Sequence, residues 1–141
     1  MTSWLQSLPH QIPFRAASSA RRIDQNTIEG TYLCSAGDAL SGVQPMPMML
    51  IEAMAQLGGG LVFGESAAPG FLSAIDEARI QSPPEVGDAL LLRVHLEAQF
   101  GGIFRFQGEA RRQGLEIASA KFYLAGAPTQ REAAPSSDEA C

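Results

Sequence analysis

The stretch PMPMMLIEAMAQLGGGLVF, from Pro45 to Phe63, carries a single charged residue, Glu52, in an otherwise apolar run. Prolines stand at its first and third positions, and the first turn of a helix tolerates proline because its amide groups lack helical partners. The apolar side chains of the run spread around the whole circumference of a helix instead of along one face. We therefore predict a helix that ends at about Phe63 and is buried on nearly all sides.

The lone carboxylate of Glu52 is the first candidate functional group. Its neighbours three and four residues away on the predicted helix are apolar except for Gln56. Burying a carboxylate without partners is costly, so Glu52 must either carry a proton or accept hydrogen bonds from other parts of the protein. Both conditions are typical of a general acid. The alternative is a structural role, in which Glu52 reaches water at a rim of the helix or pairs with an arginine of the sheet.

Three consecutive glycines, Gly58 to Gly60, lie inside the predicted helix. Each glycine costs a helix about 1 kcal/mol relative to alanine. A residue without a side chain lets a neighbouring element approach closely. We interpret these glycines as a site of close approach to a sheet or to a second subunit.

The chain after residue 70 shows the period of two residues that is typical of β-strands with one covered face. In the segment ALLLRVHLEAQF, Leu92, Val94 and Leu96 alternate with polar side chains. Short turns separate these segments and favour an antiparallel meander. Upstream, residues 15–24 and 28–35 predict two further strands about a polar turn. The four downstream strands are predicted at 71–80, 89–100, 103–112 and 115–125.

A helix that is apolar all round and a long antiparallel sheet have few ways to pack together. The sheet must bury one face and the helix must bury all of its surface, so we expect an α+β fold in which the sheet curls around a central helix. Residues 1–126 are expected to form this single domain. Residues 127–141 lack large aliphatic and aromatic side chains, and we expect them to be a disordered tail.

The composition disfavours nucleic-acid and metal binding. The formal net charge of −5 argues against general nucleic-acid binding, which needs a basic surface. The two cysteines, Cys34 and Cys141, have neither the spacing of a metal site nor that of a disulfide framework. The two histidines, His10 and His95, are flanked by no nucleophile or metal partner, and we interpret them as structural.

Other features of the sequence concern cofactors, membranes and assembly. No glycine-rich loop follows a strand and opens a helix, so we expect no nucleotide or flavin cofactor. No apolar stretch reaches the roughly 18 residues of a membrane span, and the N-terminus has no signal-peptide pattern, so we expect a cytoplasmic protein without a membrane partner. With 141 residues, of which 45% are hydrophobic, the chain is small enough that a second subunit would help to bury its core.

Four segments in order resemble the β-hydroxyacyl-acyl-carrier-protein dehydratases of the hotdog-fold superfamily. They are LPHQIPF at 8–14, LIEAMAQ at 50–56, FLSAIDEARIQSPPEVGDALLLRVHLE at 71–97 and GGIFRFQGEA at 101–110. The resemblance implies the hotdog fold, in which an antiparallel sheet wraps around a helix. It also implies a homodimer with active sites at its interface, and a trimer of dimers is an open alternative.

The resemblance implies roles for particular residues. In the family, a histidine of a Gly-His-Phe-Pro-Gly loop takes the proton beside the thioester, and a helix carboxylate helps the 3-hydroxyl group to leave as water. Glu52 matches that carboxylate, but the Gly-His pair falls on Gly37 and Asp38, so the histidine is absent and Asp38 is the candidate base. The glycine whose amide binds the thioester carbonyl falls on Pro47, which has no N–H group. A slip of one residue would place Met48 there.

The remaining candidates concern binding of the acyl chain and of its carrier. Methionine side chains either pack the core or line a flexible channel for an alkyl chain, and the substrate-binding candidates are Pro47, Met48, Met49 and Gln56. Because the carrier protein is acidic in the family, Arg79 and Arg111 are candidates for docking it. Their alternative role is that of solvated surface charges.

Three functions remain open at the level of the sequence. The first is a dehydratase that acts on 3-hydroxyacyl thioesters of acyl carrier protein or coenzyme A in fatty-acid, lipid or polyketide biosynthesis. The second is a non-catalytic subunit that binds acyl thioesters and depends on a partner for chemistry. The third is a hotdog thioesterase, in which Glu52 activates water or attacks the thioester itself.

Overall fold

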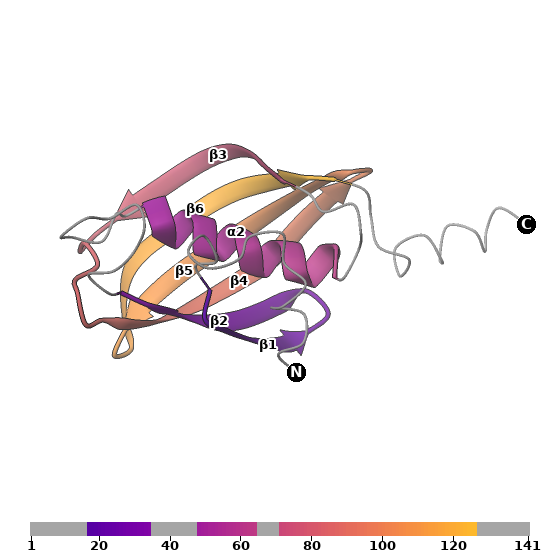
Figure 1. Cartoon of the computed structure of the whole chain (residues 1–141). Coiled ribbons are helices and arrows are strands. Elements are labelled where there is room, and N and C mark those ends of the chain that lie inside the picture. The colour runs from indigo at the N-terminus through magenta and orange to yellow at the C-terminus, as the bar shows by residue number, and fades with distance from the viewer. Residues whose placement is uncertain (1–16, 35–47, 65–70, 127–141) are drawn as a thin grey trace, which may run out of the picture.

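The computed structural model describes residues 17–34, 48–64 and 71–126 (Figure 1). The strands in these residues form one antiparallel sheet in the order β1-β2-β4-β5-β6-β3. All four predicted downstream strands are confirmed with their predicted bounds. The elements are β1 (Ser19–Asp24), β2 (Thr27–Leu33), α2 (Met48–Val62), β3 (Phe71–Ile80), β4 (Ala89–Phe100), β5 (Ile103–Arg112) and β6 (Leu115–Ala125).

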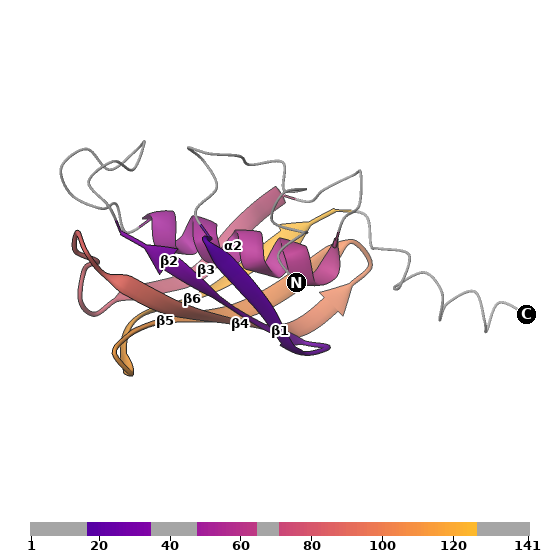
Figure 2. The same ribbon diagram turned by 60° about the horizontal axis from the view of Figure 1, so that its bottom comes forward.

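Helix α2 runs across one face of the curled sheet (Figures 1 and 2). Its residues are buried all round, except for Met48, Glu52 and Gly59. The expected α+β arrangement, a sheet that curls around a buried helix, is therefore confirmed. The predicted start of the helix at Pro45 and the predicted disordered tail at 127–141 lie outside the described residues and stay predictions.

The core lies between α2 and the inward-facing residues of the sheet. Alternate side chains of β4, β5 and β6 point towards the helix, as the period of two predicts. The rings of Phe106 and Phe122 stack with centroids 5.4 Å apart. A Cβ atom at Gly58 would lie 3.1 Å from the Phe106 ring. Gly58 therefore allows close approach of the helix to the sheet. Of the two interpretations of Gly58 to Gly60, close approach to a sheet or to a second subunit, the structure shows the first.

The predicted meander holds for β4, β5 and β6 but is wrong for β3, which pairs with β6 and not with β4. The connection after β3 crosses the end of the sheet. Its first residue, Gln81, donates its amide hydrogen to Ile117 O of β6, and its last, Asp88, accepts one from Cys34 N beside β2. The connection is therefore long enough to pass from β3 at one edge of the sheet to β4 in its interior. Its length is also compatible with a hairpin, so the length alone did not predict this path.

Arg112, at the end of β5, holds this connection in place. Its Nε and Nη2 atoms donate to Asp88 Oδ2 at 3.0 and 2.7 Å. The same guanidinium donates to Ser82 Oγ at 3.2 Å and to Pro83 O at 2.9 Å. The hydrogen bond from Arg112 holds the pKa of the Asp88 carboxyl below its ordinary value of 3.8.

The lowered pKa of Asp88 gives a prediction about stability and pH. A carboxyl whose pKa is depressed by folding stabilises the protein above its unfolded-state pKa of 3.8, and this contribution is lost as the pH falls through the folded-state pKa. Asp88→Asn should therefore lower the thermal unfolding midpoint at neutral pH, and the difference from wild type should shrink below about pH 4. Unfolding followed by circular dichroism between pH 7 and pH 3 measures this. A difference that stays constant over that range would contradict the role of Arg112.

Candidate functional site

Glu52 lies in the second turn of α2 and is half-buried. Its Oε2 atom accepts a hydrogen bond from Gln56 Nε2 at 3.2 Å. The two residues are four apart, which places them one above the other on the same face of the helix. This donor belongs to the same helix, so the expected donor from another part of the protein stays a prediction.

Gln56 is 5% exposed, and the other end of its amide group makes a further contact. Its Oε1 atom accepts a hydrogen bond from the backbone amide of Ala17 at 3.3 Å. Ala17 is buried and lies two residues before β1. The amide of Gln56 therefore links the carboxylate on the helix to the backbone that enters the sheet. Sequence reasoning missed Ala17, because a backbone donor 39 residues away leaves no signal in the side chains.

Apart from Gln56, the neighbours of Glu52 three and four residues away on its helix are apolar. Met49, three residues before it, is 8% exposed and belongs to the core, whereas Met48 is 51% exposed at the start of α2. A polar acid next to buried apolar side chains is an arrangement that suits proton transfer to a substrate held away from water. Pro47 and Asp38, the other two site candidates, lie outside the described residues.

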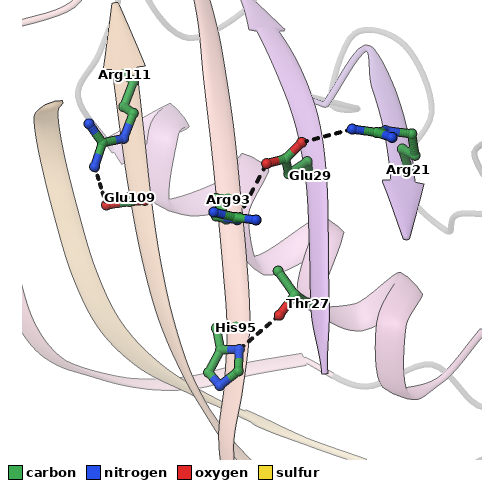
Figure 3. Close-up of polar contacts among 7 residues, drawn as sticks. All are labelled: Arg21, Thr27, Glu29, Arg93, His95, Glu109 and Arg111. Carbon is green, nitrogen blue, oxygen red and sulfur yellow. Dashed lines mark hydrogen bonds and ion pairs between the residues drawn. The ribbon is translucent and has the colours of Figure 1, made fainter. Parts of the chain in front are cut away.

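The two arginines considered for carrier docking lie on the face of the sheet turned away from α2. Arg111 Nη2 is 3.2 Å from Glu109 Oε1, and Figure 3 shows this pair on β5. Arg79, on β3, pairs with Glu77 at 3.0 Å. Each arginine therefore already has a carboxylate partner, and exposed pairs of this kind contribute little to stability.

The same outer face carries His95. Its Nδ1 atom lies 2.9 Å from Thr27 Oγ1 on the neighbouring strand (Figure 3). Glu29 on β2 contacts both Arg21 and Arg93, at 3.4 and 3.3 Å. These contacts join neighbouring strands across the sheet, and they agree with the structural interpretation of His95.

A polar groove of about 280 Å³ also lies on the outer face, over β3, β5 and β6. The sheet separates this groove from Glu52. In the groove, Arg79 pairs with Glu77, and the side chain of Gln81 donates a hydrogen bond to Glu116. The groove is therefore separate from the candidate site on the helix. The groove is lined by Glu77, Arg79, Gln81, Gln107, Glu116, Ser119, Ala120 and Lys121.

Comparisons with known proteins decide the family. No family model matches the chain. The chain is 31% identical over 134 residues to the 3-hydroxyacyl-[acyl-carrier-protein] dehydratase FabZ of Dechloromonas aromatica (strain RCB), and the match covers 86% of this chain and 93% of that protein. The chain belongs to the FabZ dehydratase family. FabZ of Acidovorax sp. (strain JS42) is 33% identical over 127 residues, which cover 76% of this chain and 83% of that protein.

Solved structures confirm the hotdog fold that the FabZ family implies. The dehydratase heterocomplex ApeI:P from Xenorhabdus doucetiae is 20% identical, with a TM-score of 0.76, and the match covers 89% of this chain and 91% of that chain. A hypothetical thioesterase from Streptococcus pneumoniae TIGR4, solved with coenzyme A, is 12% identical with a TM-score of 0.63, and the match covers 78% of this chain and 85% of that chain. At these identities the likeness concerns the fold alone.

The described residues of this FabZ-family chain contain neither a metal-binding cluster nor a membrane-spanning helix. No group of three or more histidine, cysteine, aspartate or glutamate side chains there could hold a metal ion. No helix in the described part of the chain is long and apolar enough to cross a membrane.

Proposed function

We propose that this chain removes water from a 3-hydroxyacyl thioester of an acyl carrier protein, with Glu52 as the general acid. A base takes the proton from C2, the electron pair of that C–H bond forms the double bond between C2 and C3, and the C3–O bond breaks. Glu52 gives its proton to the departing hydroxyl group, which leaves as water. The observation that carries the proposal is the half-buried carboxylate of Glu52, held by Gln56 in a chain of the FabZ family.

The base in this proposal is Asp38 or a residue of a second, different subunit. Two carboxyl groups in unlike environments can divide the roles of acid and base. A partner subunit is the other source, and the ApeI:P structure, which is a dehydratase heterocomplex, supports that option by analogy of fold. If a partner supplies the base, this chain alone would bind the thioester without turning it over.

The acyl chain is proposed to run along the start of α2, past Pro47, Met48 and Met49. Methionine is unbranched and flexible, so it adapts to alkyl chains of different shapes. Met48 is exposed at the surface, and the next residue, Met49, is buried in the core. Gln56 was also a substrate-binding candidate, but both ends of its amide group contact protein atoms.

We further propose that β3 pairs with the same strand of a second subunit, with a homodimer as the simplest assembly. β3 is an edge strand, and nearly all of its residues are exposed. Exposed edges with apolar side chains are templates for pairing with another chain, and Phe71, Ile75 and Ile80 are such side chains. Sedimentation analysis of the purified chain should give the mass of two chains, and a single-chain mass would count against the pairing.

Product analysis tests the reaction. The purified chain is incubated with a short 3-hydroxyacyl thioester of acyl carrier protein, and enoyl product and free thiol are followed together. We expect enoyl product without thiol, which would place the base within this chain, and Asp38→Asn should then lower the rate at which the product forms. Free thiol would instead establish a thioesterase. A bound thioester that stays unchanged would favour the non-catalytic subunit.

A further inference from the structure

We infer that Gln56 is a positioning residue that sets which oxygen of Glu52 delivers the proton. The inference rests on the proposed role of Glu52 as the acid. It deepens that role, because it assigns to Gln56 a contribution to the reaction that requires no contact with substrate.

The orientation of the Gln56 amide follows from its two contacts. A backbone N–H group can only donate, so the atom of Gln56 that faces Ala17 N at 3.3 Å must be the carbonyl oxygen. The NH₂ group then points the other way and lies 3.2 Å from Glu52 Oε2. Rotating the amide by half a turn would place two donors together at Ala17 and two acceptors together at Glu52.

The anchor of this arrangement is rigid. Ala17 is buried at the entry to β1, and the next residue, Ser18, donates its backbone amide hydrogen to Thr31 O on β2 at 2.8 Å. Gln56 itself is nearly fully buried on α2. The helix and the sheet therefore hold the two ends of the same side-chain amide, and neither end can turn independently.

The consequence for Glu52 concerns its two oxygens. Oε2 accepts a hydrogen bond from an amide N–H group, and in a neutral carboxyl group the carbonyl oxygen is a better acceptor than the hydroxyl oxygen. In the neutral acid, the proton therefore resides on Oε1. The direction in which Glu52 can give up its proton is set by Gln56, and through Gln56 by the backbone of Ala17.

Two substitutions of Gln56 separate this role from a merely structural one. Gln56→Met keeps the length of the side chain and removes both hydrogen bonds. Gln56→Glu keeps an oxygen that accepts the Ala17 hydrogen, but replaces the donor to Glu52 with a second acceptor. The matched control is Gln107→Met, the same chemical change on the outer face of the sheet.

We expect both Gln56 variants to lower kcat for the enoyl product by about 10- to 100-fold with KM within about twofold of wild type, because the acid is misplaced while substrate binding is kept. Gln107→Met should retain the wild-type values. If Gln56 only tied α2 to Ala17, Gln56→Glu would keep the wild-type kcat, and that result would overturn the inference. Thermal unfolding of each variant shows that the protein assayed is folded.

A measurement without turnover tests the contact itself. In ¹H–¹⁵N spectra, the side-chain amide signal of Gln56 should move when Glu52 is replaced by alanine, while the signal of Gln107 should not. An unmoved Gln56 signal would overturn the inference. Wild-type protein without enoyl product would overturn the proposed function, and with it the role of Gln56 in proton delivery. An active wild type with an unaffected Gln56→Glu would overturn the inference alone.

Discussion

Glu52→Gln is expected to lower kcat for dehydration by about 10²- to 10⁴-fold, the usual contribution of a positioned general acid. The substituted amide has nearly the same shape as the carboxyl group but has no acidic proton to transfer. Its oxygen can still accept the hydrogen bond from Gln56, so the helix should keep its packing. The loss should therefore appear in catalysis and leave the fold unchanged.

Steady-state kinetics with the carrier-protein thioester measure this effect, and thermal unfolding monitors the fold. The matched control is Glu97→Gln on the outer face, where the carboxylate contacts Arg105 at 3.4 Å. This control should retain wild-type kcat. Wild-type turnover in Glu52→Gln would show that the carboxylate has a structural role.

Gly30→Ala is expected to lower the free energy of unfolding by about 2 to 3 kcal/mol, at the upper part of the range for overpacked cores. A Cβ atom at Gly30 would collide with the backbone oxygen of Ser19 and would lie 2.7 Å from Leu57 Cδ2. The backbone oxygen belongs to β1, which pairs with β2 at this position. It cannot move away without disturbing the strand pairing, so the added methyl group must strain the structure.

The control for Gly30→Ala is a glycine with more room. At Gly59 on α2, an added Cβ atom would lie 3.8 Å from Phe63 and 4.0 Å from Leu124, which are ordinary contacts. Gly59→Ala should therefore raise the free energy of unfolding by up to about 1 kcal/mol through its helix propensity. Urea unfolding of both variants measures the two changes, and equal effects would contradict the packing described for Gly30.

The local elements could be predicted from the sequence, because their signals are local. Strands β4, β5 and β6 alternate apolar and polar side chains between short turns, and they pair with their sequence neighbours. The apolar run around Glu52 indicated a buried helix for the same reason. The partner of β3 could not be predicted, because residues 71–80 fit equally well beside β4 or β6, and the choice depends on contacts such as that of Arg112 with Asp88.

The candidate site was predictable in part. Glu52 was identified because one charge in an apolar helix requires a partner, and Gln56 because it lies one turn away. The backbone amide of Ala17 was not predictable, since it depends on how the start of β1 lies against the helix. Asp38 and Pro47 rest on the family resemblance alone and stay predictions.

The two edges of the sheet differ in a way that limits how far assembly can proceed. β3 has ten residues and exposes apolar side chains, whereas the opposite edge, β1, has six residues and carries the adjacent cations Arg21 and Arg22. Short, charged edge strands resist the addition of further strands. If β1 of one copy accepted β3 of the next, the contact would be head-to-tail and would propagate into a filament. The described part of the sheet has one receptive edge. Under the proposed pairing of β3 about a two-fold axis, the receptive edges of both chains would be used, and growth along the sheet would stop at two chains.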